Sequence, residues 1–315
     1  MHSGLQTWRG ASALPYSGQE ALRRCIDKRR LVRLVSGGVV LRKLEEIEWI
    51  EIPRGDFLFG LSESQARKLL DELPPHFRES SNQKELLLLQ QAAHRELPER
   101  RVHLQTFYIS RYPITSRQYY EFAVSNHPYS AQNMFSGQNR DTVIGNLQRA
   151  AEDTSDHPAS TSWHSAMAFC EWIGARLPTS AEWEKAARGI DGQLYPWGNH
   201  WDPMCGNFTT DRYRWPHKTA PVTAHPSGQS PYGVMDMMGN AYEFTLSTII
   251  EDAEFVIMRG TSCNYDAIMD QQYNPTWFRN RVTTYRCDHM NGAIPDITGF
   301  RPVLDQWHRR IWPHP

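Results

Sequence analysis

The chain has 315 residues, with 34 Lys and Arg against 35 Asp and Glu, so its formal charge is −1 at pH 7. This balance argues against nucleic acid or an anionic membrane as the partner, because both attract proteins with a strong positive excess. Hydrophobic residues make up 40% and aromatic residues 11%, which excludes a disordered chain and predicts one or two compact domains.

Cysteine usage and the N-terminus predict a reduced, cytoplasmic protein. The five cysteines are widely spaced and include no C-x-x-C pair, so neither a disulfide framework nor a structural zinc site is expected. No apolar stretch approaches the roughly 18 residues that a membrane-spanning helix needs. The first nine residues lack the charged start and apolar core of a secretory signal.

Residues 1–45 are basic and helix-prone, and we interpret them as a helical N-terminal extension. Leu22, Ile26 and Leu31 stand among many arginines in this segment. That pattern fits an amphipathic cap on the main domain, and it also fits a helix that docks on a partner protein.

The predicted main domain spans residues 46–304 and opens with a hairpin. Residues 47–52 alternate apolar and polar side chains, the period of a half-buried strand, and residues 57–60 resume the strand after a turn. Residues 61–98 have two helical patterns without recognisable chemistry, so we expect a helical insertion that packs on the core. Residues 305–315 form a C-terminal tail.

A strand is expected at 103–109, and helices at 115–122 and 162–173, the last with a large apolar face. Another short helix, 181–188, follows a capping box in which the Thr179 hydroxyl and the Glu182 carboxylate each accept a backbone N–H. After this helix, turn signals replace regular periodicity.

Several motifs in the second half of the chain run in a recognisable order. They are His157-Pro158, Phe169-Cys170-Glu171-Trp172, the run from Arg176 to Gly189, Tyr195-Pro196-Trp197-Gly198-Asn199, the run from Tyr232 to Phe244, Met258-Arg259-Gly260 with Ser262, and Gly299-Phe300-Arg301. Together they resemble the formylglycine-generating-enzyme (sulfatase-modifying factor) superfamily over about residues 45–304. The resemblance implies an α+β, C-type-lectin-like fold with a small twisted antiparallel sheet, two helices and long loops.

The resemblance leaves the function open, because the superfamily includes copper-dependent oxidases, iron-dependent C–S bond-forming enzymes and non-catalytic binding proteins. The copper oxidases place two thiolates three and eight residues after the Ser of an Arg-Gly-x-Ser element. Tyr265 and Asp270 occupy these positions here, and neither is a soft ligand for Cu(I). Cys263 and Cys287 lie in the same segment with a different spacing, and are the minority candidates for altered metal chemistry.

Iron is not expected either. The iron enzymes of the superfamily have an N-terminal helical bundle that supplies three histidines, whereas residues 1–45 contain only His2. The later histidines show neither HxxxH nor HExxH spacing.

A structural calcium site is implied by the resemblance at Asp236, Gly239, Ala241 and Glu243, with the two carboxylates and the two backbone carbonyls as hard oxygen ligands. The alternative is that Asp236 caps a turn and Glu243 pairs with an arginine.

The segment 263–296 would form the recognition face of the fold, because it mixes rigid aromatic anchors with adaptable polar groups. The candidate ligand-binding residues are Asn264, Tyr265, Asp266, Tyr273, Trp277, Arg279, Tyr285, Asp288, His289 and Asn291.

The sequence thus favours a non-catalytic module that binds a protein or small-molecule ligand at this face, with a retroelement-diversified protein as a special case. Two alternatives remain. One is a metal-dependent oxidoreductase with an altered active site, and the other is a structural subunit that docks on a larger assembly through residues 1–98.

Overall fold

The structure is a computed structural model of the chain. It describes residues 46–71, 97–125, 140–208, 218–248, 255–263, 287–290 and 297–305. The predicted N-terminal extension, the second half of the helical insertion and most of the C-terminal tail therefore lie outside the described residues. None of the helices in the described part of the chain is long and apolar enough to cross a membrane.

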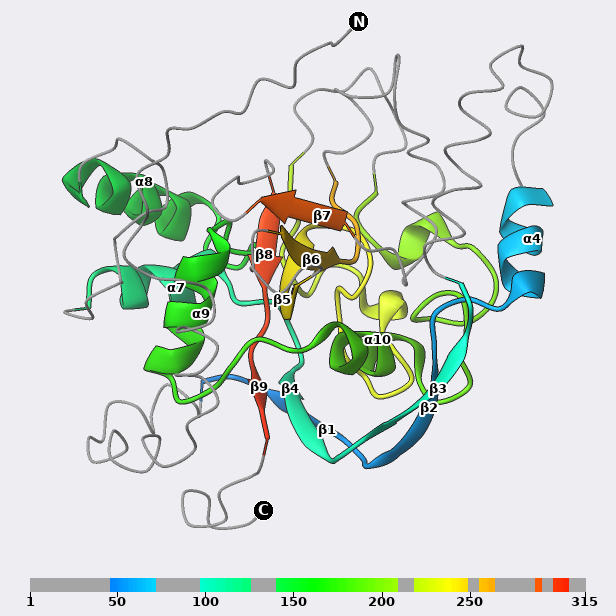
Figure 1. Cartoon of the computed structure of the whole chain (residues 1–315). Helices are drawn as coiled ribbons and strands as arrows, with labels where there is room; N and C mark the ends of the chain where they lie inside the picture. Colours follow the sequence, from blue (N-terminus) through cyan, green and yellow to red (C-terminus); the bar gives the residue numbers. More distant parts are fainter. Residues whose placement is uncertain are drawn as a thin grey trace, which may run out of the picture.

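The described residues form three small sheets and five α-helices joined by loops, which confirms the α+β class (Figure 1). The sheets have the strand orders β1-β4-β9, β2-β3 and β7-β6-β5-β8. The elements are β1 (Trp49–Ile52), β2 (Gly55–Phe59), α4 (Glu63–Asp71), β3 (Arg100–Leu104), β4 (Phe107–Ser110), α7 (Ser116–Ala123), α8 (Arg140–Asp153), α9 (Trp163–Trp172), α10 (Ser180–Arg188), β5 (Tyr242–Thr248), β6 (Phe255–Arg259), β7 (Cys287–Met290), β8 (Thr298–Phe300) and β9 (Val303–Leu304), with two 3₁₀ turns at Pro203–Cys205 and Pro226–Gly228.

The expected hairpin between residues 47–52 and 57–60 is wrong, because these segments continue one another. β1 pairs with β4 and β2 pairs with β3, both antiparallel. Ile52 lies opposite Phe107 and Gly55 opposite Leu104, so one register continues across the break. Pro53 lacks an N–H and interrupts the ladder without reversing the chain.

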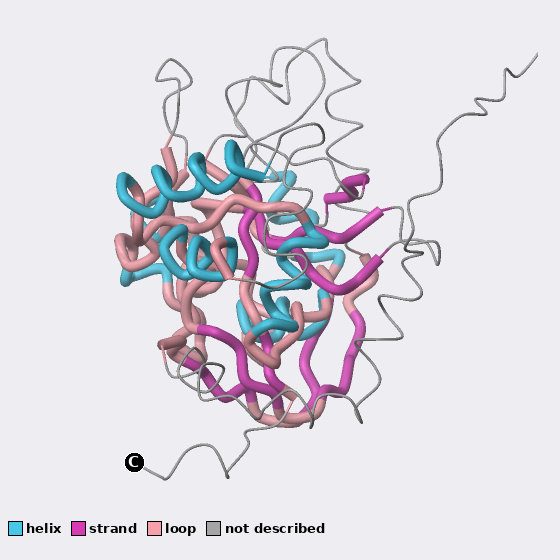
Figure 2. The backbone as a smooth tube through the Cα atoms, turned by 90° about the vertical axis from the view of Figure 1, so that its left-hand side faces the viewer, coloured by secondary structure: helices cyan, strands magenta, loops and turns pink. Residues whose placement is uncertain are grey.

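The true reversal of this long hairpin lies in the 61–98 insertion. The pair β1–β4 and the pair β2–β3 follow one another along this bent hairpin (Figures 1 and 2). The expected strand at 103–109 is divided into β3 and β4 at the same break, where the Arg54 N–H donates to Thr106 Oγ1 at 3.1 Å. α4 begins where the sequence predicts the first helix of the insertion.

Helices α7, α9 and α10 begin at the predicted caps. The capping box of α10 is present: the Glu182 N–H donates to Thr179 Oγ1 at 3.2 Å, and the Thr179 N–H donates to Glu182 Oε2 at 2.8 Å. The helix ends at Gly189, whose φ of 72° suits a residue without a Cβ.

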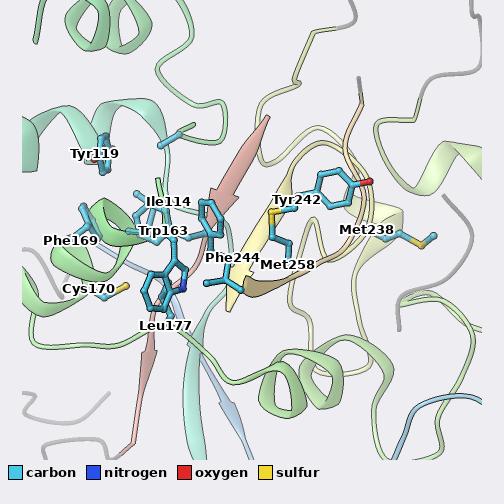
Figure 3. Packing of buried hydrophobic residues seen from close by; sticks show 14 of the residues in the cluster. Ile114, Tyr119, Trp163, Phe169, Cys170, Leu177, Met238, Tyr242, Phe244 and Met258 are labelled. Carbon is cyan, nitrogen blue, oxygen red and sulfur yellow. The ribbon is translucent and has the colours of Figure 1, made fainter. Parts of the chain in front are cut away.

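The main core lies between α7, α9 and the sheet that contains β5 and β8 (Figure 3). Tyr119 and Phe169 stack with ring centroids 6.1 Å apart, and Phe300 meets both rings edge-on. The Trp163 indole donates to the Thr245 carbonyl at 2.8 Å, so its one polar atom is satisfied in the interior. Each such aromatic side chain contributes about 1.5–3 kcal/mol by its burial.

Charged side chains of α10 hold both ends of β2 by binding backbone atoms. The Lys185 Nζ donates to the carbonyls of Pro53 and Gly55 at 2.6 and 3.0 Å, where β2 starts. At the other end, Glu184 Oε1 accepts the Gly60 N–H at 2.7 Å. Glu184 and Lys185 are both fully buried.

Candidate functional site

The segment between residues 235 and 241 is a tight polar turn that leads into β5. Asp236 and Asn240 adopt left-handed backbone conformations, with φ of 58° and 64°, which short polar side chains tolerate. Gly239 has a φ of 87°, and a Cβ there would lie 3.0 Å from the Asn207 carbonyl oxygen. Glycine is therefore required at this position by both conformation and space.

Asp236 is a buried carboxyl group with little compensation for its charge. Its exposed fraction is 8%, and its Oδ2 accepts a hydrogen bond from Asn240 Nδ2 at 2.7 Å. Burial raises the pKa of Asp236 to about 7, although the Asn240 bond and the Arg301 charge both lower it. No described residue donates a hydrogen bond to its Oδ1.

Both carboxylate oxygens of Glu243 accept hydrogen bonds from neighbouring side chains. Arg301 donates from Nη2 to Oε1 and from Nε to Oε2, both at 2.6 Å. The Trp183 indole also donates to Oε2, at 2.8 Å. The parallel pairing of β5 with β8 places Glu243 opposite Gly299 and so brings Arg301 alongside. The structure thus shows the arginine pair that was the alternative to calcium binding at Glu243.

Three positions of the implied calcium site, Asp236, Gly239 and Ala241, lie in this turn, and Glu243 follows on β5; the four fit a cation only in part. Asp236 offers an oxygen to a hard cation, whereas Glu243 already accepts three hydrogen bonds. The Gly239 carbonyl accepts the Ala241 N–H at 2.8 Å. Calcium takes six to eight oxygen ligands, so water would have to supply several of them. The described residues include no cluster of three or more His, Cys, Asp or Glu arranged around a metal position.

Cys263 is a buried thiol. Its exposed fraction is 1%, and burial raises its pKa to about 12, so it remains protonated at neutral pH. Cys287 lies on β7, where the strand register places it opposite Met258. The side chain of Cys287 lies outside the described residues, so metal chemistry by Cys263 and Cys287 stays a prediction.

Most of the predicted recognition face also lies outside the described residues. This applies to Asn264, Tyr265, Asp266, Tyr273, Trp277, Arg279, Tyr285 and Asn291. Asp288 and His289 are on β7, and their backbones pair with Ile257 and Val256 of β6. Of the predicted face, the structure thus describes Cys263 at its start and the backbone of β7.

Sequence reasoning missed Asn240, whose side chain is 1% exposed and makes four hydrogen bonds. These bonds reach Asn207, Ala220 and Asp236. The Gly-Asn dipeptide at 239–240 is a turn signal that indicates a left-handed conformation. It contains no information on the distant backbone groups that the amide binds.

Comparison with known protein families supplies a match over most of the chain. The sulfatase-modifying factor enzyme 1-like domain family matches residues 42–306.

Among curated relatives, the inactive C-alpha-formylglycine-generating enzyme 2 of Bos taurus is 38% identical over 149 residues, which is 44% of this chain and 47% of that protein. The formylglycine-generating enzyme of Bos taurus is 29% identical over 262 residues, or 67% of this chain and 68% of that protein. The chain thus spans about half the length of the first relative and about two thirds of the second.

Two solved structures share the fold. PvdO from Pseudomonas aeruginosa aligns with a TM-score of 0.52 and 18% identity, over 81% of this chain and 93% of that one. Treponema denticola variable protein 1 aligns with a TM-score of 0.53 and 14% identity, over 82% and 95%. At these identities the likeness establishes the C-type-lectin-like fold and nothing about activity.

Proposed function

The chain belongs to the sulfatase-modifying factor enzyme 1-like family, and on that premise we propose that it is a non-catalytic member that binds a protein or small ligand. The segment 263–296 supplies the recognition surface. The observation that carries this proposal is the donor set: Tyr265 and Asp270 stand where the oxidases of the family have copper-binding thiolates.

The state of Cys263 supports the same proposal. A Cu(I) site needs two thiolates that can reach the same ion, and Cys263 is buried, with a spacing to Cys287 that differs from that of the pair in the family's copper oxidases. The relative from Bos taurus that is 38% identical is itself named inactive, which agrees with loss of catalysis in this branch.

Calcium binding at Asp236 forms part of the proposal. One oxygen of the Asp236 carboxylate accepts no hydrogen bond from the residues that the structure describes, and such an oxygen in a buried turn suits a hard cation, whose charge would offset the burial of Asp236. The ion would have a structural role, because it would stiffen the turn that precedes β5.

The proposal is tested with the full chain and two variants. Peptide and glycan arrays are probed with the purified protein, and any ligand found is measured by calorimetry. A variant with Tyr273, Trp277 and Tyr285 replaced by Ala should lose binding by at least about 100-fold, because aromatic anchors dominate recognition surfaces. A control variant with three exposed arginines, Arg67, Arg101 and Arg117, replaced by Ala should retain it.

A catalytic assay provides the contradicting outcome. The protein is loaded with Cu(I), and separately with Fe(II), and is incubated with a cysteine peptide and oxygen while aldehyde formation is followed by mass spectrometry. No aldehyde is expected. Stoichiometric metal together with oxidation that the Cys263→Ala variant abolishes would overturn the proposal in favour of an oxidoreductase.

A further inference from the structure

The side chain of Asn240 joins two segments that are distant in sequence. Its Nδ2 donates to the Ala220 carbonyl at 3.0 Å, while its Oδ1 accepts the Ala220 N–H at 2.8 Å. The same Oδ1 accepts a bond from Asn207 Nδ2 at 3.1 Å. With the bond to Asp236, every hydrogen-bonding position of this amide is used.

The backbone of Asn240 extends the connection to a further segment. Its N–H donates to the Asn207 carbonyl at 2.9 Å, and its own carbonyl accepts the Cys263 N–H at 3.1 Å. Cys263 is the first residue of the segment 263–296. A second bond runs in parallel, from the Gly239 N–H to Thr261 Oγ1 at 2.9 Å.

Asn207 also contacts the stretch 218–220 directly. Its Nδ2 also donates to the Lys218 carbonyl at 2.9 Å, so Asn207 and the stretch 218–220 are linked directly and through Asn240. The group made of Asn207, Lys218–Ala220, Asn240 and Cys263 is called the Asn240 junction below.

We propose that Asn240 is a positioning residue that fixes the start of the recognition segment, at Cys263, against Asn207 and residues 218–220, so that these parts of the chain open as one unit. The recognition role of the segment rests on the proposed function, whereas the coupling itself does not. A buried polar network transmits the loss of one bond, because each freed buried group then lacks a partner.

The coupling predicts a shared opening in the wild-type chain. The amides of Ala220, Asn240 and Cys263 donate to Asn240 Oδ1, Asn207 O and Asn240 O, respectively. If the junction opens as one unit, native-state hydrogen exchange of these three amides has one opening free energy and one denaturant dependence.

A variant tests the same coupling through the Cys263 thiol. Asn207→Ala removes the two bonds from Asn207 Nδ2 and leaves every bond between Asn240 and Cys263 in place. Alkylation of Cys263 by iodoacetamide in the presence of a chelator is followed by peptide mass spectrometry. It should become about three- to tenfold faster, the effect expected when one partly buried and one exposed hydrogen bond are lost.

The matched control is Gln65→Ala, which removes an amide that donates to the Gly192 carbonyl at 2.7 Å and has no contact with the junction. Both variants are compared at equal free energy of unfolding, adjusted with urea, so that a purely structural effect of Asn207 is cancelled. Selective acceleration in Asn207→Ala supports the proposal. Equal Cys263 labelling in the two variants, or opening free energies of Ala220 and Cys263 that differ in the wild type, would overturn it.

Neither measurement uses a ligand. Failure of the coupling therefore leaves the binding proposal standing, and failure of ligand binding leaves the coupling standing.

Discussion

Glu243 and Arg301 form an ion pair inside the protein, with side-chain exposed fractions of 1% and 0%. Arg301 also donates to the carbonyls of Ser110, Arg111 and Met235, so its remaining donors are satisfied as well. The pair therefore connects β5, the end of β4 and the turn before Asp236. Because the desolvated charges depend on one another, removal of one partner leaves the other uncompensated.

Arg301→Met should lower the free energy of unfolding by about 3–5 kcal/mol, the range for breaking a buried ion pair. Urea denaturation followed by Trp fluorescence measures it. The double variant with Glu243→Gln should lose less than the sum of the single variants, because no charge is then left unpaired. The control is Glu48→Gln in the exposed pair with Arg111, where the expected loss is within about 1 kcal/mol. A similar loss in both pairs would contradict the prediction.

The effect of the Asp236 carboxylate on the stability of the folded protein should have opposite signs with and without calcium. Its folded pKa of about 7 lies above its ordinary value of 3.8, so between these pH values the folded state retains a proton that the unfolded state has lost. Without calcium, this group therefore makes the protein less stable as the pH rises from about 4 to about 7.

Asp236→Asn should therefore raise the melting temperature at pH 8 in a chelator and should flatten its pH dependence. If calcium binds, wild type should gain several degrees on addition of calcium at pH 8, and the variant should gain none. A wild-type melting temperature that does not respond to calcium would contradict the calcium proposal but not the pH prediction.

Lys185→Met should destabilise the protein by about 1–3 kcal/mol, because the Pro53 and Gly55 carbonyls lose their buried donor. Hydrogen exchange should rise first in residues 53–60. Lys68→Met is the matched control, since the Lys68 Nζ lies at the surface, 3.4 Å from the Asn199 carbonyl oxygen. Its expected effect is within about 0.5 kcal/mol.

Replacement of glycine by alanine should stabilise the protein at Gly145 and destabilise it at Gly239. Gly145→Ala lies in α8, where a Cβ would meet nothing within 4 Å, and should stabilise by about 0.5–1 kcal/mol. Gly239→Ala must adopt a left-handed conformation beside the Asn207 carbonyl and should destabilise by more than about 1 kcal/mol. Thermal unfolding of the two variants checks the pair, and equal signs would contradict it.

Local signals were predictable from the sequence. The Thr179–Glu182 capping box is present because both partners lie within one helical turn, and the ordered motifs identified the family correctly. The strand pairing of residues 49–59 was wrong, because Pro53 and Gly55 are turn signals whose effect here is only to interrupt a ladder. The correct partner strands lie across an insertion whose length no local pattern specifies.

The candidate site was less predictable for the same reason. The sequence suggested that Asp236 and Glu243 bind calcium together. In the structure the guanidinium of Arg301, 58 residues from Glu243 in sequence, pairs with the Glu243 carboxylate, and the parallel pairing of β5 with β8 brings the two side chains together. The charged residues of α10 showed no sign of burial in the sequence. Many of their partners are backbone atoms, such as the Pro53 carbonyl, which any residue type would present. Others are distant side chains, such as that of Arg259, which pairs with Glu184.

The strand register that continues across Pro53 predicts which changes in length this stretch tolerates. Side chains alternate between two faces along a strand, so deletion of one residue between Ile52 and Phe57 would turn one of these two buried side chains away from the interior. Substitutions at the exposed positions of this stretch, such as Glu51 and Arg54, should therefore be tolerated better than single-residue deletions between Ile52 and Phe57, and a mutational scan should find such deletions depleted.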